Sequence, residues 1–198
     1  RRPEGSYGKD CRSRCARDHY KNDQGRANWV GGDYRLIMTT LPAHKLMLGI
    51  ETQWNTLLEQ RNFDVLPATS YLDSNRTSNT LGVFVQDELR LSPQWLLNLG
   101  LRHDKHSDYS AITSPRAALI YQPNEGATLK VMAGSAYRAP NAYERFYDDG
   151  GVLQKSNPAL LPERIRSVEL AADFQVGQAG RFGVNFYHND VQDLIDQV

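Results

Sequence analysis

The side chains that could take part in metal or redox chemistry lie in two short segments. Cys11 and Cys15 are the only cysteines, and His19 is the only metal-ligating residue near them that could join a zinc site. A structural zinc site uses four ligands, so the pair favours a small disulfide in an oxidising compartment, with two reduced thiols as the alternative. The segment from His103 to His106, with sequence HDKH, lies where a strand is expected to end and is interpreted as a solvated loop. We therefore expect no metal site.

The motifs of nucleophilic and nucleotide chemistry are missing from the sequence. Ser, His and Asp all occur, but the chain has no G-x-S-x-G elbow and no metalloprotease helix motif. The glycine pairs at 31–32 and 150–151 form no phosphate-binding fingerprint. We expect no catalytic residue, no cofactor and no enzymatic activity.

The composition excludes further classes of protein. The 198 residues carry 23 basic and 23 acidic side chains, and this balance argues against a nucleic-acid partner. No stretch approaches the ~20 apolar residues of a membrane-spanning helix. The chain opens with RRPEGSYGKD, which is charged where a signal peptide would be apolar, and Arg1 follows no initiator Met. We therefore expect native N-terminal sequence to be missing.

The elements that must position these residues are strands. From about residue 28 onward, apolar residues recur at every second position in about eight segments, as in the runs 81–91 and 95–102. The alternate positions carry mainly Glu, Gln, Asn, Arg and Lys, and no amphipathic helix is evident. The pattern predicts an all-β, antiparallel fold.

The connections between these strands alternate in length. Short ones are expected near 41–44, 92–94, 122–126 and 175–180, and long polar ones near 56–78, 103–113 and 139–162, with 1–27 as a fourth. This alternation is typical of a transmembrane β-barrel with short periplasmic turns and long extracellular loops. A soluble β-sandwich, the alternative, also alternates apolar and polar side chains, but it gives no reason for a long loop at every second connection.

Two sequence boxes flank the connection at 139–162. Tyr137-Arg138-Ala139-Pro140 ends one strand, and Asn157-Pro158-Ala159-Leu160-Leu161-Pro162-Glu163 precedes the next. Together with further stretches in order between 28 and 198, these boxes resemble the TonB-dependent outer-membrane receptors of the siderophore type. Arg138 and Glu163 stand at facing ends of the loop and could pair.

The resemblance implies a 22-stranded barrel around an N-terminal plug domain, driven by the TonB–ExbB–ExbD system. The chain shows no plug and no TonB box, so we expect about eight strands of such a barrel. A complete eight-stranded barrel is the structural alternative. The expected organisation is a basic extracellular loop at 1–27, which holds the Cys pair, followed by a partial barrel domain at 28–198. The loop carries eight basic against four acidic residues, which could attract an anionic chelate or lipopolysaccharide phosphates, although an ordinary solvated loop would look the same.

The resemblance also implies a function. It is uptake of a scarce nutrient, above all a ferric siderophore, at the outer membrane of a Gram-negative bacterium, among outer-membrane lipids and lipopolysaccharide. Haem receptors of this kind usually carry a His between the two boxes, and residues 141–156 contain none. The candidate ligand contacts there are Arg138, Tyr143, Glu144, Phe146 and Tyr147. The alternatives are a soluble β-sandwich binding module and a small outer-membrane barrel without energised transport.

Overall fold

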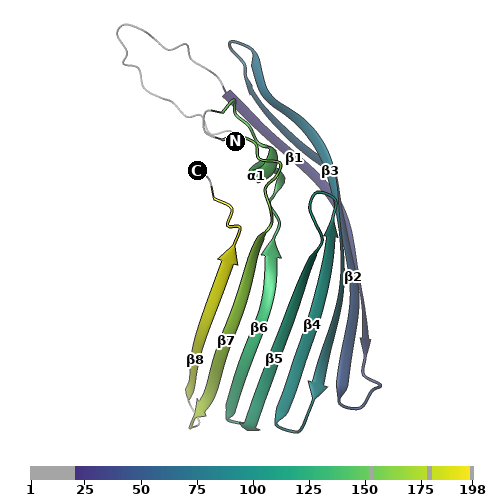
Figure 1. Cartoon of the computed structure of the whole chain (residues 1–198), viewed down its shortest axis with the longest axis vertical. Helices are drawn as coiled ribbons and strands as arrows, with labels where there is room; N and C mark the ends of the chain where they lie inside the picture. Colours follow the sequence, from purple (N-terminus) through teal and green to yellow (C-terminus); the bar gives the residue numbers. More distant parts are fainter. Residues whose placement is uncertain (1–20, 152–153, 178–179, 197–198) are drawn as a thin grey trace, which may run out of the picture.

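The computed structural model describes residues 21–151, 154–177 and 180–196, which form one antiparallel sheet of eight strands in sequence order. Figure 1 shows these strands side by side in a single curved layer. They are β1 (Lys21–Met38), β2 (His44–Asp64), β3 (Thr69–Arg90), β4 (Trp95–His106), β5 (Ile112–Asn124), β6 (Ala127–Arg138), β7 (Glu163–Val176) and β8 (Gly180–Gln192). A short helix, α1 (Ala142–Phe146), lies between β6 and β7. No helix in the described part of the chain is long and apolar enough to cross a membrane. The predicted all-β class with about eight strands is confirmed.

The alternation of side chains gives the sheet an apolar face and a polar face. The register keeps apolar residues opposite one another in rows, one of which runs through Leu119, Val131, Leu170 and Phe186 on β5–β8. The last three of these side chains are exposed, and the described residues form no second sheet that could cover them. A β-sandwich needs such a second sheet. The described fold is therefore a single curved wall with an uncovered apolar face.

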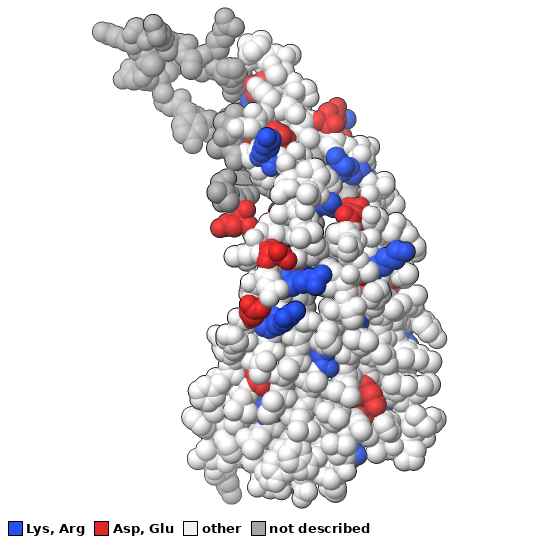
Figure 2. All heavy atoms as spheres, viewed as in Figure 1, with Lys and Arg blue, Asp and Glu red and all other residues white. Residues whose placement is uncertain are grey.

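The apolar face is a band of limited height. On β2 it runs from Leu46 to Trp54 and on β7 from Val168 to Val176, which matches the ~9–11 residues with which a tilted strand crosses a bilayer. Near the short turns, the rings of Trp95 and Tyr121 stack with their centroids 4.4 Å apart, as in the aromatic girdles of membrane barrels. Figure 2 shows few charged side chains over the part of this view that holds the short turns and many over the opposite part.

The polar face holds charged side chains that pair with one another across the strands. Arg102 on β4 donates to both carboxylate oxygens of Asp104, at 2.8 and 2.9 Å from its Nε, and its Nη1 donates to Glu51 on β2 at 2.7 Å. On the same face, Arg116 on β5 donates to the side-chain oxygen of Gln86 on β3. Such a face suits the hydrated or plugged interior of a barrel.

The four short connections lie where the sequence predicts them, with ends that differ by at most three residues. They occupy 39–43, 91–94, 125–126 and 177–179. In the turn after β3, the hydroxyl of Ser92 accepts from the backbone N–H groups of Gln94 and Trp95, each at 3.2 Å. All four lie at the same end of the sheet (Figure 1).

Two of the expected long loops are wrong in extent. Within 56–78, β2 continues to Asp64 and β3 begins at Thr69, so that only 65–68 form a turn. Within 103–113, β4 continues to His106 and β5 begins at Ile112. Beyond the apolar band both faces of a strand can be wet, so the alternation that identifies a strand from its sequence is lost there. The connection at 139–162 is confirmed, apart from the short helix within it.

The first strand also begins earlier than predicted. β1 starts at Lys21, so residues 21–27 of the expected extracellular loop are strand and pair with β2. These residues have no alternation of apolar and polar side chains, so their sequence does not identify them as a strand. The cysteine pair, Cys11 and Cys15, lies outside the described residues, and its disulfide stays a prediction.

Candidate functional site: the loop between β6 and β7

The connection at 139–162 reaches across the polar face to the strands at the other side of the sheet. Figure 1 shows α1 beside the ends of β1 and β3, although β6 and β7 lie several strands away in the sheet order. Hydrogen bonds and an ion pair link the loop to β1 and β2, and a cation–π contact links it to β3. The loop is therefore held in place by strands far from it in sequence.

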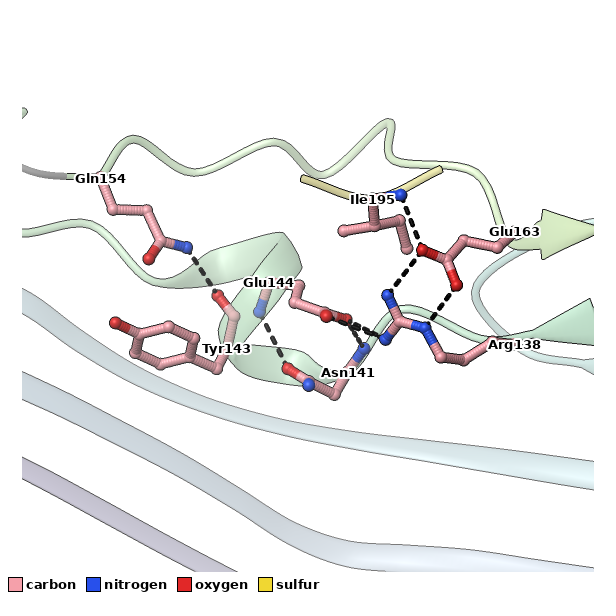
Figure 3. A network of polar contacts seen from close by, with 7 residues as sticks. All are labelled: Arg138, Asn141, Tyr143, Glu144, Gln154, Glu163 and Ile195. Carbon is pink, nitrogen blue, oxygen red and sulfur yellow. Dashed lines mark hydrogen bonds and ion pairs between the residues drawn. The ribbon is translucent and has the colours of Figure 1, made fainter. Parts of the chain in front are cut away.

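Arg138, the last residue of β6, joins the two sequence boxes (Figure 3). Its Nε donates to Oε2 of Glu163 at 2.6 Å and its Nη2 to Oε1 at 3.0 Å. Its Nη1 donates to both carboxylate oxygens of Glu144 in α1, at 2.8 and 3.0 Å. Oε1 of Glu163 also accepts from the backbone N–H of Ile195, at 2.7 Å. The pairing of Arg138 with Glu163 expected from the sequence is confirmed, and it closes the base of the loop.

The short helix is fixed by a capping box that shares a carboxylate with this network. The side-chain oxygen of Asn141 accepts from the backbone N–H of Glu144 at 2.9 Å, and the Glu144 carboxylate accepts from the backbone N–H of Asn141 at 2.8 Å. Because Glu144 serves both the cap and Arg138, the start of α1 and the end of β6 are positioned together.

Tyr147 anchors the end of α1 to the first two strands. Its hydroxyl donates to Oδ1 of Asp23 on β1 at 2.6 Å and accepts from Nδ2 of Asn62 on β2 at 2.7 Å. Asn62 is fully buried. Desolvation, and then the hydrogen bond to Asp23, raise the pKa of Tyr147 to about 12. The phenol therefore stays protonated and donates this bond over the physiological pH range.

Cations surround Phe146. The guanidinium of Arg76 on β3 lies 3.8 Å from the ring centroid, and that of Arg145 lies 4.8 Å from it. Arg145 is itself buried, with Nη1 3.2 Å from the Asp108 carboxylate and Nη2 donating to the carbonyl of Pro158 at 2.7 Å. Arg145 thus ties α1 to the 107–111 connection and to the second sequence box.

Beyond the helix, the loop passes over the tip of β3. Nζ of Lys21 lies 3.3 Å from Oδ2 of Asp149, which is 1% exposed. Gly150 has a φ of +84°, and a Cβ built on it would lie 2.7 Å from Cδ1 of Tyr71. The loop can pass so close to the Tyr71 ring only because this residue is a glycine.

A cavity of about 380 Å³ lies between the loop and the polar face of β2 and β3. Its lining combines aromatic and polar side chains, among them His106, Tyr109, Tyr137 and Phe146. The rings of His106 and Tyr109 stack with their centroids 4.1 Å apart. Burial, and then the neighbouring Tyr137, raise the pKa of the Tyr109 phenol. Such a lining can stack on and hydrogen-bond a ligand without any covalent step.

The candidate ligand contacts fall into two groups. Arg138, Glu144 and Tyr147 are engaged by other residues of the protein, and Phe146 lies among cations. Tyr143 is 45% exposed and stacks on Tyr147 at a centroid distance of 4.4 Å. Tyr143 is therefore the member of the set that is freest to meet a ligand.

No sequence pattern marks the residues that contact the loop from elsewhere in the sheet. Asp23, Asn62, Arg76 and Asp108 contact the loop from distant positions in the chain. All four look like ordinary polar residues of strands or turns, and only the register of the sheet shows that they meet the loop. Arg145 lies between the two sequence boxes, in α1, and nothing in the surrounding sequence indicates that it would contact Asp108.

Comparison with known proteins identifies relatives of this chain. The family described as "TonB dependent receptor-like, beta-barrel" matches residues 3–198, starting upstream of residue 28, from which the sequence boxes show the resemblance. The chain is 25% identical over 187 residues to the iron-regulated outer membrane virulence protein of Vibrio cholerae, covering 90% of this chain and 28% of that protein. It is 30% identical over 194 residues to the ferric enterobactin receptor PirA of Pseudomonas aeruginosa, covering 82% and 26%.

A solved structure agrees with the fold. The copper transporter OprC superposes with a TM-score of 0.68 at 19% identity, covering 88% of this chain and 31% of that one. The chain thus spans between about a quarter and a third of the length of these proteins. Of these three proteins, one is named a receptor and one a transporter. Because the family match covers almost the whole chain, the chain belongs to the TonB-dependent receptor family, as part of the β-barrel.

Proposed function

We propose that the whole protein of which this chain is part takes up a ferric siderophore across the outer membrane of a Gram-negative bacterium. The observation that carries the proposal is the loop at 139–162, which the protein itself braces over the polar face while leaving the Tyr143 ring exposed. The names of two relatives, one iron-regulated and one a ferric enterobactin receptor, support this cargo.

The proposed mechanism needs no bond to be made or broken. The chelate stacks on the exposed aromatic surface and is hydrogen-bonded by the surrounding loop, with part of a large, flat ligand entering the cavity beneath α1. A plug within a barrel of about 22 strands then transmits energy from the TonB–ExbB–ExbD system. The polar face, with its paired charges, lies toward that plug.

The test is uptake of iron by cells that carry the complete gene. A deletion strain complemented with the gene should grow under iron limitation on at least one purified ferric siderophore and should take up radioactive iron from it. The same cells without tonB should take up none. Growth unchanged by the deletion on every chelate, together with a growth defect on cobalamin or copper, would overturn the siderophore proposal while leaving energised transport in place.

Tyr143 provides the test within the loop. We expect Tyr143→Ala to weaken binding of that siderophore about three- to tenfold, because stacking on an aromatic ring contributes about 0.5–1.5 kcal/mol. Titration of the purified receptor by quenching of its tryptophan fluorescence measures this. Leu161→Ala is the matched control, since Leu161 is an exposed apolar residue of the same loop. Equal loss in both variants would contradict the role of the ring.

A further inference from the structure

The wall has a split between β5 and β6. The two strands pair from Asn124–Ala127 to Arg116–Gly134 and no further. Beyond that point 112–115 pair only with β4, and 135–138 only with β7. Figure 1 shows β6 turning away from β5 toward the loop end of the sheet. Pro115 lies next to the last pair of the β5–β6 ladder. Because proline has no N–H to donate, it explains why the hydrogen bonding between the two strands ends there.

The split leaves strand edges without partners inside a membrane barrel. Within the described residues, the edge of β5 at 112–115 and that of β6 at 135–138 have no strand opposite. Ser135 stands opposite Arg166 on β7, beyond the Val168 end of the apolar band, so the unpaired edge of β6 lies at the level of the headgroups, where its backbone groups still need hydrogen-bonding partners. A molecule with hydrogen-bonding groups is therefore the expected neighbour of the split, and not hydrocarbon alone.

A cavity of about 830 Å³ lies at the split. Apolar residues of the outward face line most of it, including Leu99, Leu101, Pro115, Ala133 and Val168. Its charged lining residues are Arg164 and Arg166 on β7, Arg116, which donates to Gln86, and Asp87, which is paired with His44. By alternation Arg164 and Arg166 share the face of Val168 and Leu170, directly beyond the end of the apolar band. The cavity thus combines an apolar wall with two cations at the level where lipid headgroups begin.

In the part of the chain that the structure describes, neither arginine is paired with an acidic side chain. Both are exposed, and within the described ranges neither side chain forms a hydrogen bond or ion pair. Asp190 on β8 stands opposite Arg166 in the register, but its carboxylate accepts from Gln192 at 2.9 Å. Arg61 on the same outward face behaves differently, because Glu59 and Asp73 lie 2.9 and 3.2 Å from its Nε. Two adjacent free guanidinium groups are suited to a phosphate.

We propose that the split binds one lipopolysaccharide molecule from the outer leaflet. A lipid A phosphate lies against Arg164 and Arg166, an acyl chain follows the apolar wall past Leu101 and Val168, and the amide and sugar groups meet the unpaired strand edges. Lipopolysaccharide is the lipid chosen because the arginines lie on the side of the 139–162 loop, which faces outward in the proposed orientation. The inference rests on the barrel lying in the outer membrane and not on the identity of the cargo.

The experiment is a lipid titration of the complete receptor purified in detergent. Native mass spectrometry with added lipid A should show one tightly bound molecule, and Arg164→Gln with Arg166→Gln should weaken that binding by at least about tenfold. Arg61→Gln removes one positive charge from the same face but outside the cavity, and should leave binding unchanged. Heat-dependent migration on gels checks that each variant is folded, and siderophore uptake is measured separately so that the two proposals can fail independently.

A second variant tests the cavity rather than the charge. Ala133→Trp keeps both arginines and fills the apolar wall, so it should also weaken lipid A binding. Phosphatidylglycerol, added as the competing anionic lipid, should bind more weakly than lipid A and respond less to the arginine substitutions. Lipid A binding that survives both kinds of variant, or phosphatidylglycerol that binds equally well, would overturn the proposal.

Discussion

At the scale of single residues, Arg138 shows that a residue of a sequence motif can hold neighbouring elements in place without contacting a ligand. Its three guanidinium nitrogens are divided between Glu163 and Glu144. This leaves the arginine as a brace between the end of β6, the start of β7 and the helix. A lysine in its place has one charged nitrogen and cannot reproduce the planar, bidentate geometry.

We therefore expect Arg138→Lys to loosen the loop without unfolding the barrel. Backbone amides of 141–147 should exchange with deuterium about three- to tenfold faster, because each lost hydrogen bond contributes modestly to local stability. Hydrogen-exchange mass spectrometry on the complete receptor measures this, with Arg61→Lys on β2 as the control. Unchanged exchange in the loop would show that Glu144 and Asn141 hold α1 without Arg138.

We expect a larger loss of stability from a substitution at Asn62, because this residue is fully buried. Asn62→Ala removes the side-chain amide that donates to both Asp23 and Tyr147, so each of these residues loses one hydrogen bond. A buried polar group left unsatisfied costs about 1–3 kcal/mol. Denaturant titration of the receptor should show a loss in that range, whereas Tyr147→Phe, which removes only a hydroxyl, should lose less. A larger loss of stability in Tyr147→Phe would show that the hydrogen bond from Tyr147 to Asp23 contributes more than those made by Asn62.

At the scale of elements, what the sequence predicts depends on whether an element has one apolar face. The run 95–102 alternates throughout, and 81–91 does so apart from Asp87 on its apolar face; both lie in strands, as the pattern predicts, and the four short turns lie within three residues of their predicted places. Residues 21–27 and most of 56–78 are strands with no apolar stripe, and from the sequence they look like loops. The site escapes prediction for a further reason, since Asn62 and Arg76 meet the loop only through strand register.

The loop's passage over β3 depends on one backbone conformation at Gly150. Gly150→Ala should destabilise the loop by about 1–2 kcal/mol from its left-handed φ alone, and further because the new methyl group would press on Tyr71. Gly151→Ala is the matched control, because Gly151 has a similar φ of +75° but nothing within 4 Å of the added Cβ. Limited proteolysis of the intact receptor should therefore cut the Gly150 variant faster. Equal cleavage of the two variants would show that Tyr71 yields to the methyl group.

At the scale of the whole molecule, the uncovered apolar face determines where the wall can exist. Leu170 lies within the band and is exposed, while the preceding residue, Glu169, lies on the polar face. Leu170→Arg would place a charge in hydrocarbon, which costs about 2–4 kcal/mol near the bilayer centre. Glu169→Arg introduces the same side chain one residue away but points it toward the interior, where water or a plug can accommodate it.

Folding of the complete receptor into lipid vesicles distinguishes these two faces. Leu170→Arg should lower the denaturant midpoint markedly, and Glu169→Arg should change it little. The comparison bears on the assignment of the membrane face, because both variants place the same arginine side chain on the same strand and the larger change in charge, at Glu169, falls on the polar face. If the Glu169 variant were the less stable one, the polar face would be the face in contact with lipid. The cavity at the split between β5 and β6 would then open toward the interior, and a lipid could not reach Arg164 and Arg166.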